Sequence, residues 1–484
     1  MALFSRSNVF CAFLVLLVCA PLEAQTGSNP IGCAVPKRPV HIYYVDPING
    51  SMNGDGSAQR PWSTLAAVVS AGLINGQNKA SGVVHAGDLI YLLSGDHGSV
   101  NLSQYTGSFV NTDFITVQAA PGNTPVLEQL IATGIAKWVF RGLTITNPNG
   151  PANASSVFLS RFSACNNILF DRNTIYSQAN VNNWTPSDWA ALSFRGLAID
   201  ANSATVTNNI VKNVLTGIGV SGDGVIFRGN VVDYFADDGI DFQTSNSILQ
   251  YNVVTNHYGQ WNNGGHHDGM QGWTLTSDVY SNVLIDSNFI LASTGAYPAI
   301  PQPTGLGDDY LQGLSIFDGD WSNLTVTNNV VGACAYDGLS LYGIANSVIE
   351  NNTVINVGSD PDALTWLKVG AQPGYPVTNV TVRNNIANTF QLDRSGGVVD
   401  DHNLTFNNGY DNMWSKVSTN LFVADPTTVF VQYHPATSTF DFNLIKGSPA
   451  IGAGTATNAP TLDILKRTRN PLSIDIGAYM YVGN

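Results

Sequence analysis

The chain has 484 residues, of which only 11% are charged, and its formal net charge at pH 7 is −14. This balance excludes the basic surface with which proteins usually bind nucleic acids. Hydrophobic residues make up 44% of the chain, and glycine is frequent, with 47 residues. Such a composition favours short strands joined by tight turns over long helices.

The N-terminus has the pattern of a secretory signal. Arg6 precedes an apolar run over residues 9–20, and Ala24 ends a plausible cleavage site. The run is short for a transmembrane helix, so a membrane anchor is the less favoured alternative. We therefore expect residues 1–24 to be a signal peptide. The mature protein is expected to be secreted or periplasmic, monomeric and free of the membrane.

The rest of the chain divides into a start, a repetitive core and an end. Residues 25–115 contain the pattern of an initial strand and a helix near residues 65–73, which would cap the open end of an apolar core. Residues 116–410 carry two repeated patterns and are expected to form the core with its active-site loops. Residues 411–484 are expected to close the fold.

The first repeated pattern is an asparagine that follows a short alternating strand and precedes a β-branched or aromatic residue. Its shortest spacing is 21 residues, from Asn209 to Asn230, and a period in the twenties is typical of solenoids. The repeated residues are Asn173, Asn209, Asn230, Asn252, Asn288, Asn329, Asn352 and Asn385. We expect these side chains to hydrogen-bond their copies in neighbouring coils and so to be structural.

The second pattern is a repeated strand whose first column ends in four aspartates. The aligned strands begin at residues 195, 216, 238, 268, 309 and 337, and the last four begin with Asp238, Asp268, Asp309 and Asp337. Three short strands per repeat predict an all-β fold, a right-handed parallel β-helix (solenoid) with an N-terminal helical cap. Neighbouring rungs would lie about 4.8 Å apart, so the carboxylates repel one another unless a metal, a shared proton or a substrate compensates.

Alternation along these strands divides their side chains between core and surface. Ile240, Phe242 and Met270 are expected inside. The outer face would carry one row of Asp241, Gln271, Gln312 and Ser340 and a second row of Gln243, Trp273, Leu314 and Tyr342. Residues 257–267, 294–308 and 358–376 are expected to be loops that wall this face. Almost no basic residue falls within the rows.

Motifs at both ends resemble a known group of proteins. Tyr44-Val-Asp-Pro47, Pro61-Trp-Ser-Thr-Leu65 and Gly87-Asp-Leu-Ile-Tyr91 are similar to the N-terminal part of exported right-handed β-helix proteins. That group includes polysaccharide lyases of the pectate lyase and chondroitinase type. Residues 447–454 and 475–479 resemble the "choice-of-anchor Q" ending found on many of them. The resemblance implies the β-helix fold and a polysaccharide substrate.

The residues around the aspartate column suit β-elimination of a uronate-containing polysaccharide. His267 or His266 would take the C5 proton as the base, with Tyr258 or His257 as the acid. The candidate catalytic residues are Asp238, Asp241, His266, His267 and Asp268. Ca²⁺ prefers hard oxygen ligands, and its candidate ligands are Asp237, Asp238, Asp268 and Asp309. Candidate substrate-binding residues are Tyr258, Trp261, Gln243, Gln271, Trp273, Gln312 and Tyr342.

Other functions stay open from the sequence. Asp238 and Asp268 on adjacent rungs would suit a retaining glycoside hydrolase, and Asp238 with Asp309 an inverting one. C5 epimerisation needs the same groups as elimination, and a non-catalytic carbohydrate-binding surface protein is a further alternative. An aspartate before a glycine often only forms a turn. The doubled acids and the adjacent histidines favour catalysis, and the resemblance favours the lyase.

Overall fold

The fold of this chain consists mainly of parallel strands that wind into successive coils. The computed structural model describes residues 36–75, 82–103, 111–151, 153–259, 266–274, 278–297, 311–358, 364–407 and 417–483. They belong to two compact units, residues 24–235 and residues 236–484. Each unit confirms the predicted all-β class and the right-handed parallel β-helix. The boundaries expected at residues 115 and 410 stay predictions, and the expected signal peptide lies outside the described residues. No helix in the described ranges is long and apolar enough to cross a membrane.

In residues 24–235 three series of parallel strands repeat along the chain. The first series is β1 (Ile42–Val45), β2 (Leu89–Leu92), β5 (Ile115–Ala119), β8 (Ala136–Arg141), the end of β10 (Phe158–Asp171), β13 (Thr205–Thr207) and β16 (Ile226–Arg228). The second is β4 (Ser99–Ser103), β7 (Gln129–Thr133), the start of β10, β12 (Arg195–Asn202) and β15 (Ile218–Asp223). The third is β3 (Gly95–Asp96), β6 (Pro125–Leu127), β9 (Thr144–Ile145), β11 (Thr174–Tyr176), β14 (Ile210–Val214) and β17 (Val231–Phe235).

Two short α-helices accompany these strands. Helix α2 (Leu65–Ser70) begins after the capping residue Thr64 and buries Val68 and Val69, which confirms the predicted N-terminal helix. It is shorter than expected because the backbone turns left-handed at Gly72, with φ 68°. Helix α3 (Pro186–Leu192) has a capping box between Thr185 and Asp188. One 3-10 turn, η1 (Ala154–Ser156), precedes β10.

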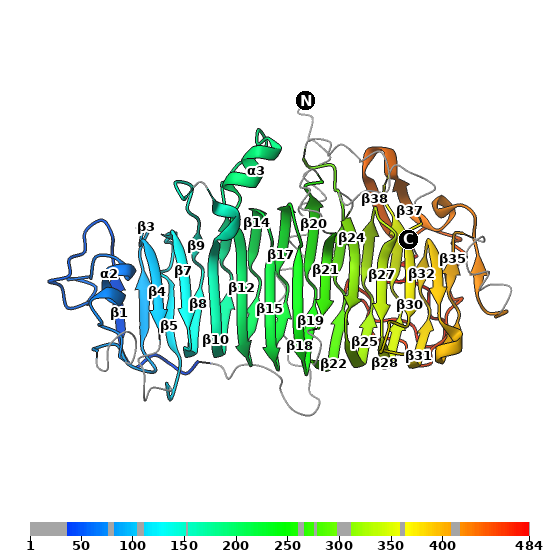
Figure 1. Cartoon of the computed structure of the whole chain (residues 1–484), viewed down its shortest axis with the longest axis horizontal. Coiled ribbons are helices and arrows are strands. Elements are labelled where there is room, and N and C mark those ends of the chain that lie inside the picture. Colours follow the sequence, from blue (N-terminus) through cyan, green and yellow to red (C-terminus); the bar gives the residue numbers. More distant parts are fainter. Residues whose placement is uncertain are drawn as a thin grey trace. The chain divides into compact units, whose positions relative to one another are not determined.

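Residues 236–484 contain three further series, and Figure 1 shows β22, β25, β28 and β31 of the second series side by side. The first is β18 (Ile240–Ser245), β21 (His267–Trp273), β24 (Leu311–Phe317), β27 (Asp337–Tyr342), β30 (Trp366–Gly370) and β33 (Thr389–Leu392). The second is β19 (Ser247–Gln250), β22 (Val279–Asp286), β25 (Asp320–Thr327), β28 (Ile344–Glu350), β31 (Thr378–Arg383) and β34 (Val398–Asp401). The third is β20 (Val253–His257), β23 (Phe289–Leu291), β26 (Val330–Ala333), β29 (Thr353–Asn356), β32 (Ile386–Ala387), β35 (Leu404–Thr405) and β36 (Leu421–Phe422).

After these coils the chain forms a single antiparallel pair and then irregular structure. Strand β37 (Phe430–His434) pairs with β38 (Thr439–Leu444). Three 3-10 turns, η2 (Arg394–Gly396), η3 (Pro426–Thr428) and η4 (Pro435–Thr437), complete the regular elements.

Side chains alternate between the coil interior and the surface as expected. Ile240, Phe242 and Met270 are all fully buried, as predicted. Phe242 packs edge-on against Trp321, with ring centroids 5.8 Å apart. A Cβ at Gly272 would lie 2.6 Å from a Phe242 ring carbon, so only glycine leaves room for this ring. The coil interior is therefore a packed apolar core that leaves polar groups on the outer face.

Buried asparagines bond from coil to coil, which confirms the predicted ladder. In residues 236–484 each backbone N–H donates to the Oδ1 of the next member at 2.9–3.0 Å, along Asn252, Asn288, Asn329, Asn352, Asn385, Asn403 and Asn420. In residues 24–235 the same bonds join Asn173, Asn209 and Asn230. Asn403 and Asn420 were not predicted, because each is followed by leucine and so lies outside the repeated pattern; their spacings are 18 and 17 residues.

Replacing Asn352 with alanine is expected to lower the free energy of unfolding by about 3 kcal/mol, because several buried hydrogen bonds are lost together. Asn352 Oδ1 accepts from Asn329, and its Nδ2 donates to the Val326 carbonyl and to Asn385. Urea unfolding measures the change. Asn388→Ala serves as a control, since no side-chain hydrogen bond of Asn388 occurs among the described residues, and an equal loss in both variants would contradict the ladder's role.

The end of the chain lies along the coil corner that precedes this ladder. Asn328, Asn351 and Asn384 hold left-handed backbone conformations, with φ of 54–55°. Their Nδ2 groups donate to the carbonyls of Leu462 (3.0 Å), Asp475 (2.9 Å) and Thr455 (2.8 Å), respectively. Arg469, only 4% exposed, donates to Asn328 Oδ1 at 2.9 Å. Residues 454–480, the C-terminal strap, thus satisfy the corner amides of three coils.

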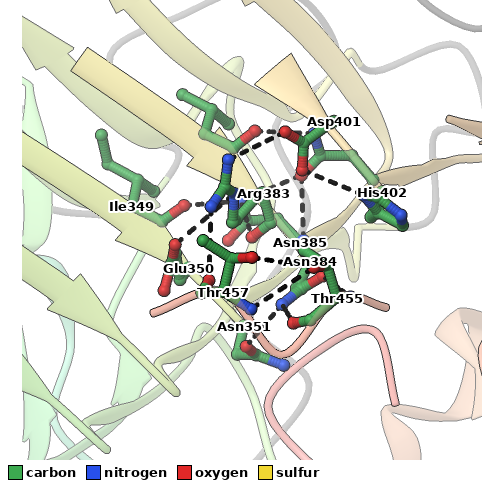
Figure 2. Close-up of polar contacts among 12 residues, drawn as sticks. Ile349, Glu350, Asn351, Arg383, Asn384, Asn385, Asp401, His402, Thr455 and Thr457 are labelled. Atoms are coloured by element: carbon green, nitrogen blue, oxygen red, sulfur yellow. Dashed lines mark hydrogen bonds and ion pairs between the residues drawn. The ribbon is translucent and has the colours of Figure 1, made fainter. Parts of the chain in front are cut away.

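A charged cluster joins the strap to the coils (Figure 2). Glu350, Arg383 and Asp401 stand in register at the ends of β28, β31 and β34. Arg383 donates from Nη2 to Asp401 at 2.9 Å and from Nη1 to the Thr457 carbonyl at 3.3 Å. Glu350 is fully buried, 3.7 Å from Arg383 Nε, and neither of its carboxylate oxygens has a hydrogen-bond partner in the described ranges. Burial raises the pKa of Glu350 to about 7, although Arg383 opposes the shift.

Glu350 is expected to destabilise the fold as pH rises. A carboxyl group with a folded-state pKa of about 7 and an ordinary value of 4.5 keeps its proton longer when folded, so stability is lost between these two values. Glu350→Gln should therefore raise the free energy of unfolding by about 2–3 kcal/mol at pH 8 and change it little at pH 4. Urea unfolding at both pH values measures this. Asp401→Asn, which removes a bonded partner of Arg383, should instead destabilise at pH 8, and a pH-independent effect of Glu350→Gln would contradict the assignment.

Candidate active site on the outer face of residues 236–484

In the first strand series, β18 and β21 pair in the predicted register, but β21 and β24 pair in a different one. Ile240 pairs with Met270, and Gly239 N–H donates to the Asp268 carbonyl at 2.9 Å, so Asp238 lies beside Asp268 as expected. On the following rung Asp268 pairs with Gln312, whereas the sequence alignment placed Asp309 there. Asp309 itself lies outside the described residues. The aspartate column is therefore interrupted by Gln312 before it reaches Asp337.

The physical reason for this correction is burial. The predicted alignment put Leu314 on the surface, but the observed register pairs Leu314 with Met270 and buries both Leu314 and Ile316 completely. A shift by an odd number of residues exchanges the two faces of a strand, so apolar burial decides the register. The outer rows are Asp241, Gln271, Ser315, Ser340 and Lys368, then Gln243, Trp273, Phe317 and Tyr342.

Asp268 and His266 form a hydrogen-bonded pair at this face. Asp268 is fully buried, and its Oδ2 lies 2.7 Å from His266 Nδ1. The His266 side chain is 52% exposed. The bond to Asp268 raises the pKa of His266, against the opposing effect of partial burial. Since Nδ1 is engaged by the carboxylate, Nε2 is the nitrogen left for proton transfer.

His267 and His257 lie inside the structure. His267 is fully buried and its Nδ1 is 3.3 Å from Asp237, while its ring lies 5.0 Å from that of His257. Burial, with the neighbouring His267, lowers the pKa of His257 to about 3, so this ring is neutral at ordinary pH. Tyr258 is 7% exposed. Of the predicted bases and acids in this segment, His266 is the one that reaches the surface.

Asp238 differs from Asp268 in its neighbours. Its Oδ1 accepts a hydrogen bond from the Asp268 backbone N–H at 2.9 Å. Burial, followed by the charges of Asp241, Asp268 and Asp237, raises the pKa of Asp238 well above its usual range. Asp238 is therefore a candidate proton donor, whereas the partly exposed Asp241 beside it is a candidate carboxylate.

An aromatic row continues from His266 along the coils. The His266 and Phe317 rings lie 5.6 Å apart, and Phe317 stacks on Tyr342 at 5.4 Å. Phe317 also pairs in register with Trp273, so the row takes in the predicted Trp273 and Tyr342 together with Phe317. Such a row of rings matches the flat faces of sugar rings.

The row ends at a group that the sequence analysis missed. Lys368 pairs in register with Ser340, and its Nζ lies 4.9 Å from the Tyr342 ring centroid and 4.8 Å from that of Trp366. Residues 358–376 were expected to form a loop, but they contain strand β30. The alternation in Trp366-Leu-Lys-Val-Gly370 was the signal that could have placed Lys368 in the outer row.

The remaining predicted substrate-binding residues divide by exposure. Gln243, Gln271 and Trp273 are partly exposed on the outer face. Gln312 is only 5% exposed and stands beside Asp268 instead of beside Gln271, so its predicted place was wrong. Trp261 lies outside the described residues.

Three carboxylates of the predicted calcium site already lie against nitrogen groups of the protein. Asp268 binds His266, Asp237 lies against His267, and Asp238 accepts from the Asp268 backbone. No group of three or more His, Cys, Asp or Glu within the described residues is arranged to hold a metal ion. Asp309, the fourth expected ligand, lies outside the described residues, so the calcium prediction stays untested.

Comparison with known proteins identifies the fold and stops short of a function. Residues 195–372, less than half of the chain, match the family described as a right handed beta helix region. No curated protein matches the chain in sequence. The structure is similar to that of XylC in complex with xylose, with a TM-score of 0.55, 9% identity, and coverage of 91% of this chain and 98% of that one. At this identity the likeness shows the fold alone.

Two further solved structures match this chain with lower TM-scores. Pectate lyase Pel9A has a TM-score of 0.46 and 16% identity, and the match covers 92% of this chain and 97% of that chain. The lacto-N-biosidase of family GH136 from Eubacterium ramulus has a TM-score of 0.42 and 12% identity, with coverage of 75% and 64%.

Proposed function

We propose that this protein is a secreted polysaccharide lyase that cleaves a uronate-containing glycan by β-elimination on the outer face of residues 236–484. The observation that carries the proposal is the pair formed by buried Asp268 and half-exposed His266. A buried carboxylate bonded to Nδ1 fixes the ring and its tautomer, so Nε2 faces the substrate as a general base. The aromatic row beside His266 offers a surface for the sugar rings.

The proposed elimination needs one group that accepts a proton and one that donates a proton. His266 Nε2 takes the C5 proton of the uronate, whose carboxylate makes that proton acidic. The electron pair of the broken C5–H bond forms the C4=C5 double bond, and the C4–O bond to the leaving sugar breaks. Asp238, which the surrounding carboxylates and burial keep protonated, donates its proton to the departing oxygen. No step depends on a metal ion.

Removing the base or its partner should abolish most of the activity. His266→Gln is expected to lower kcat on a uronate polymer by roughly 1000-fold and Asp268→Asn by roughly 100-fold, within the usual contribution of a general base. Absorbance of the unsaturated product near 235 nm follows the reaction. His434→Gln is a control distant in sequence, and retained activity in His266→Gln would refute the assignment.

The pH profile gives a separate test. As a base, His266 must be neutral, and its raised pKa means that it stays protonated to a pH above its ordinary value of 6.5. The rate should therefore increase as pH rises, with a midpoint above 6.5. In Asp268→Asn the residual activity should show this midpoint at a lower pH, because the carboxylate that raises it is gone. An unchanged midpoint in the variant would contradict the pairing.

A glycoside hydrolase is the second candidate, and one observation favours it. Burial and then the charge of Asp241 raise the pKa of Asp238, so a candidate acid and a candidate carboxylate stand together. Reducing ends measured beside absorbance near 235 nm separate the two reactions. Reducing ends without absorbance would indicate hydrolysis, and a glycan bound but never cut would indicate a carbohydrate-binding protein. Treatment with a chelator tests the calcium prediction in the same assay.

A further inference from the structure

Lys368 is held between two aromatic rings on the outer face. Its Nζ lies 4.8–4.9 Å from the centroids of Trp366 and Tyr342. Both rings present their faces to the ammonium group, which restricts where that group can lie. Lys368 is partly exposed, so its charge stays accessible from solvent.

The buried Asp337 holds the Trp366 and Tyr342 rings in place by hydrogen bonds. It is 3% exposed, and its Oδ1 accepts hydrogen bonds from Ser340 Oγ at 2.6 Å, Trp366 Nε1 at 2.8 Å and Tyr342 Oη at 3.3 Å. Because these donors use the Asp337 carboxylate, it orients the two rings and makes no ion pair with the lysine. None of the ion pairs found in the described residues includes Lys368. Among the described residues Lys368 is therefore a positioned cation that makes no ion pair with an acid.

The strand register shows how many rungs separate Lys368 from Asp268, the partner of the proposed base. Asp268 is on β21, and β24, β27 and β30 follow one rung at a time, so Lys368 is three rungs further along the coils. Three spacings of about 4.8 Å put about 14 Å between the backbones of the first and last of these strands. The His266 ring reaches Phe317 and the Lys368 ammonium reaches Tyr342, and these two rings still lie between the base and the cation, so Lys368 is placed for a neighbouring sugar of the chain.

We propose that Lys368 binds an anionic substituent on a second sugar of the same glycan chain, so that the protein selects polymers with acidic groups on successive sugars. This inference rests on the proposed function, since His266 marks the reacting sugar. The protein carries a formal charge of −14, and a polyanion is repelled by most of such a surface. Lys368, held beside the row of aromatic rings, attracts an anionic group and so offsets this repulsion at one place on the surface.

The test measures binding without cleavage. The His266→Gln protein and the His266→Gln/Lys368→Met protein are titrated by calorimetry with a polyuronate and with the same polymer after carboxyl reduction. Lys368→Met should weaken binding of the polyuronate roughly tenfold, and less so at high salt, and leave binding of the reduced polymer unchanged. Lys368→Arg keeps the charge and should retain most of the affinity. A neutral glucan and its sulfate ester, used as further probes, distinguish carboxylate from sulfate recognition.

Two results would overturn the inference. Equal weakening with both polymers would mean that Lys368 only supports the rings, and no weakening with any acidic polymer would mean that it does not bind the glycan. Cleavage of oligouronates of increasing length adds a second readout: kcat/KM should rise until the chain spans both groups, and Lys368→Met should remove that rise. If no glycan is cut but the calorimetric difference stands, the proposed lyase reaction fails and the anion site does not.

Discussion

The hydrogen bonds that asparagine side chains make from coil to coil are the constraint on which the other features depend. The Oδ1 of each ladder member accepts from a buried backbone N–H in the preceding coil, and this repeats at 2.9–3.0 Å along residues 252–420. A coil cannot shift by one residue without breaking these bonds and turning its apolar side chains outward. The strand register therefore decides which residues lie side by side on the outer face. The position of a residue within its repeat determines where on that face its side chain stands.

Three aspartates of the same strand series show how neighbours create different chemistry from one residue type. Burial and the charges of neighbouring carboxylates raise the pKa of Asp238. Asp268 is bonded to His266 and orients a base. Asp337 accepts from Ser340, Trp366 and Tyr342 and orients aromatic rings. Their backbone positions are similar, so the differences come from the residues on adjacent rungs.

The fold could be predicted from the sequence because it is encoded in repeats. The asparagine spacing and the alternation around Ile240 and Phe242 both reflect local rules that every coil obeys. The site was only partly predictable, because it depends on pairings between coils joined by long segments. Gln312 was assigned to the wrong column of β24, because the similarity of residues 309–314 to residues 268–273 suggests a register that the burial of Leu314 excludes. Lys368 was missed because its strand follows a segment without the repeat.

Exposure was the other property that the sequence concealed. His266 and His267 are adjacent and identical in type, yet one is half-exposed and the other is buried against Asp237. The strand alternation does not account for this difference, because His266 precedes β21 and residues 267–270 are all buried. The exposure of the two histidines depends on how the preceding segment approaches the strand, which the repeat pattern does not encode.

The C-terminal strap bonds to coils that are synthesised well before it. Arg469 donates to Asn328, which precedes it by 141 residues, and the corner amides of Asn351 and Asn384 likewise bond to residues near the end of the chain. While the nascent chain emerges from the ribosome, coils can form one after another, but these amides have only water as a partner. The strap is thus translated well after the coils whose corner amides it satisfies, and a polypeptide terminated before residue 454 would leave those amides to water.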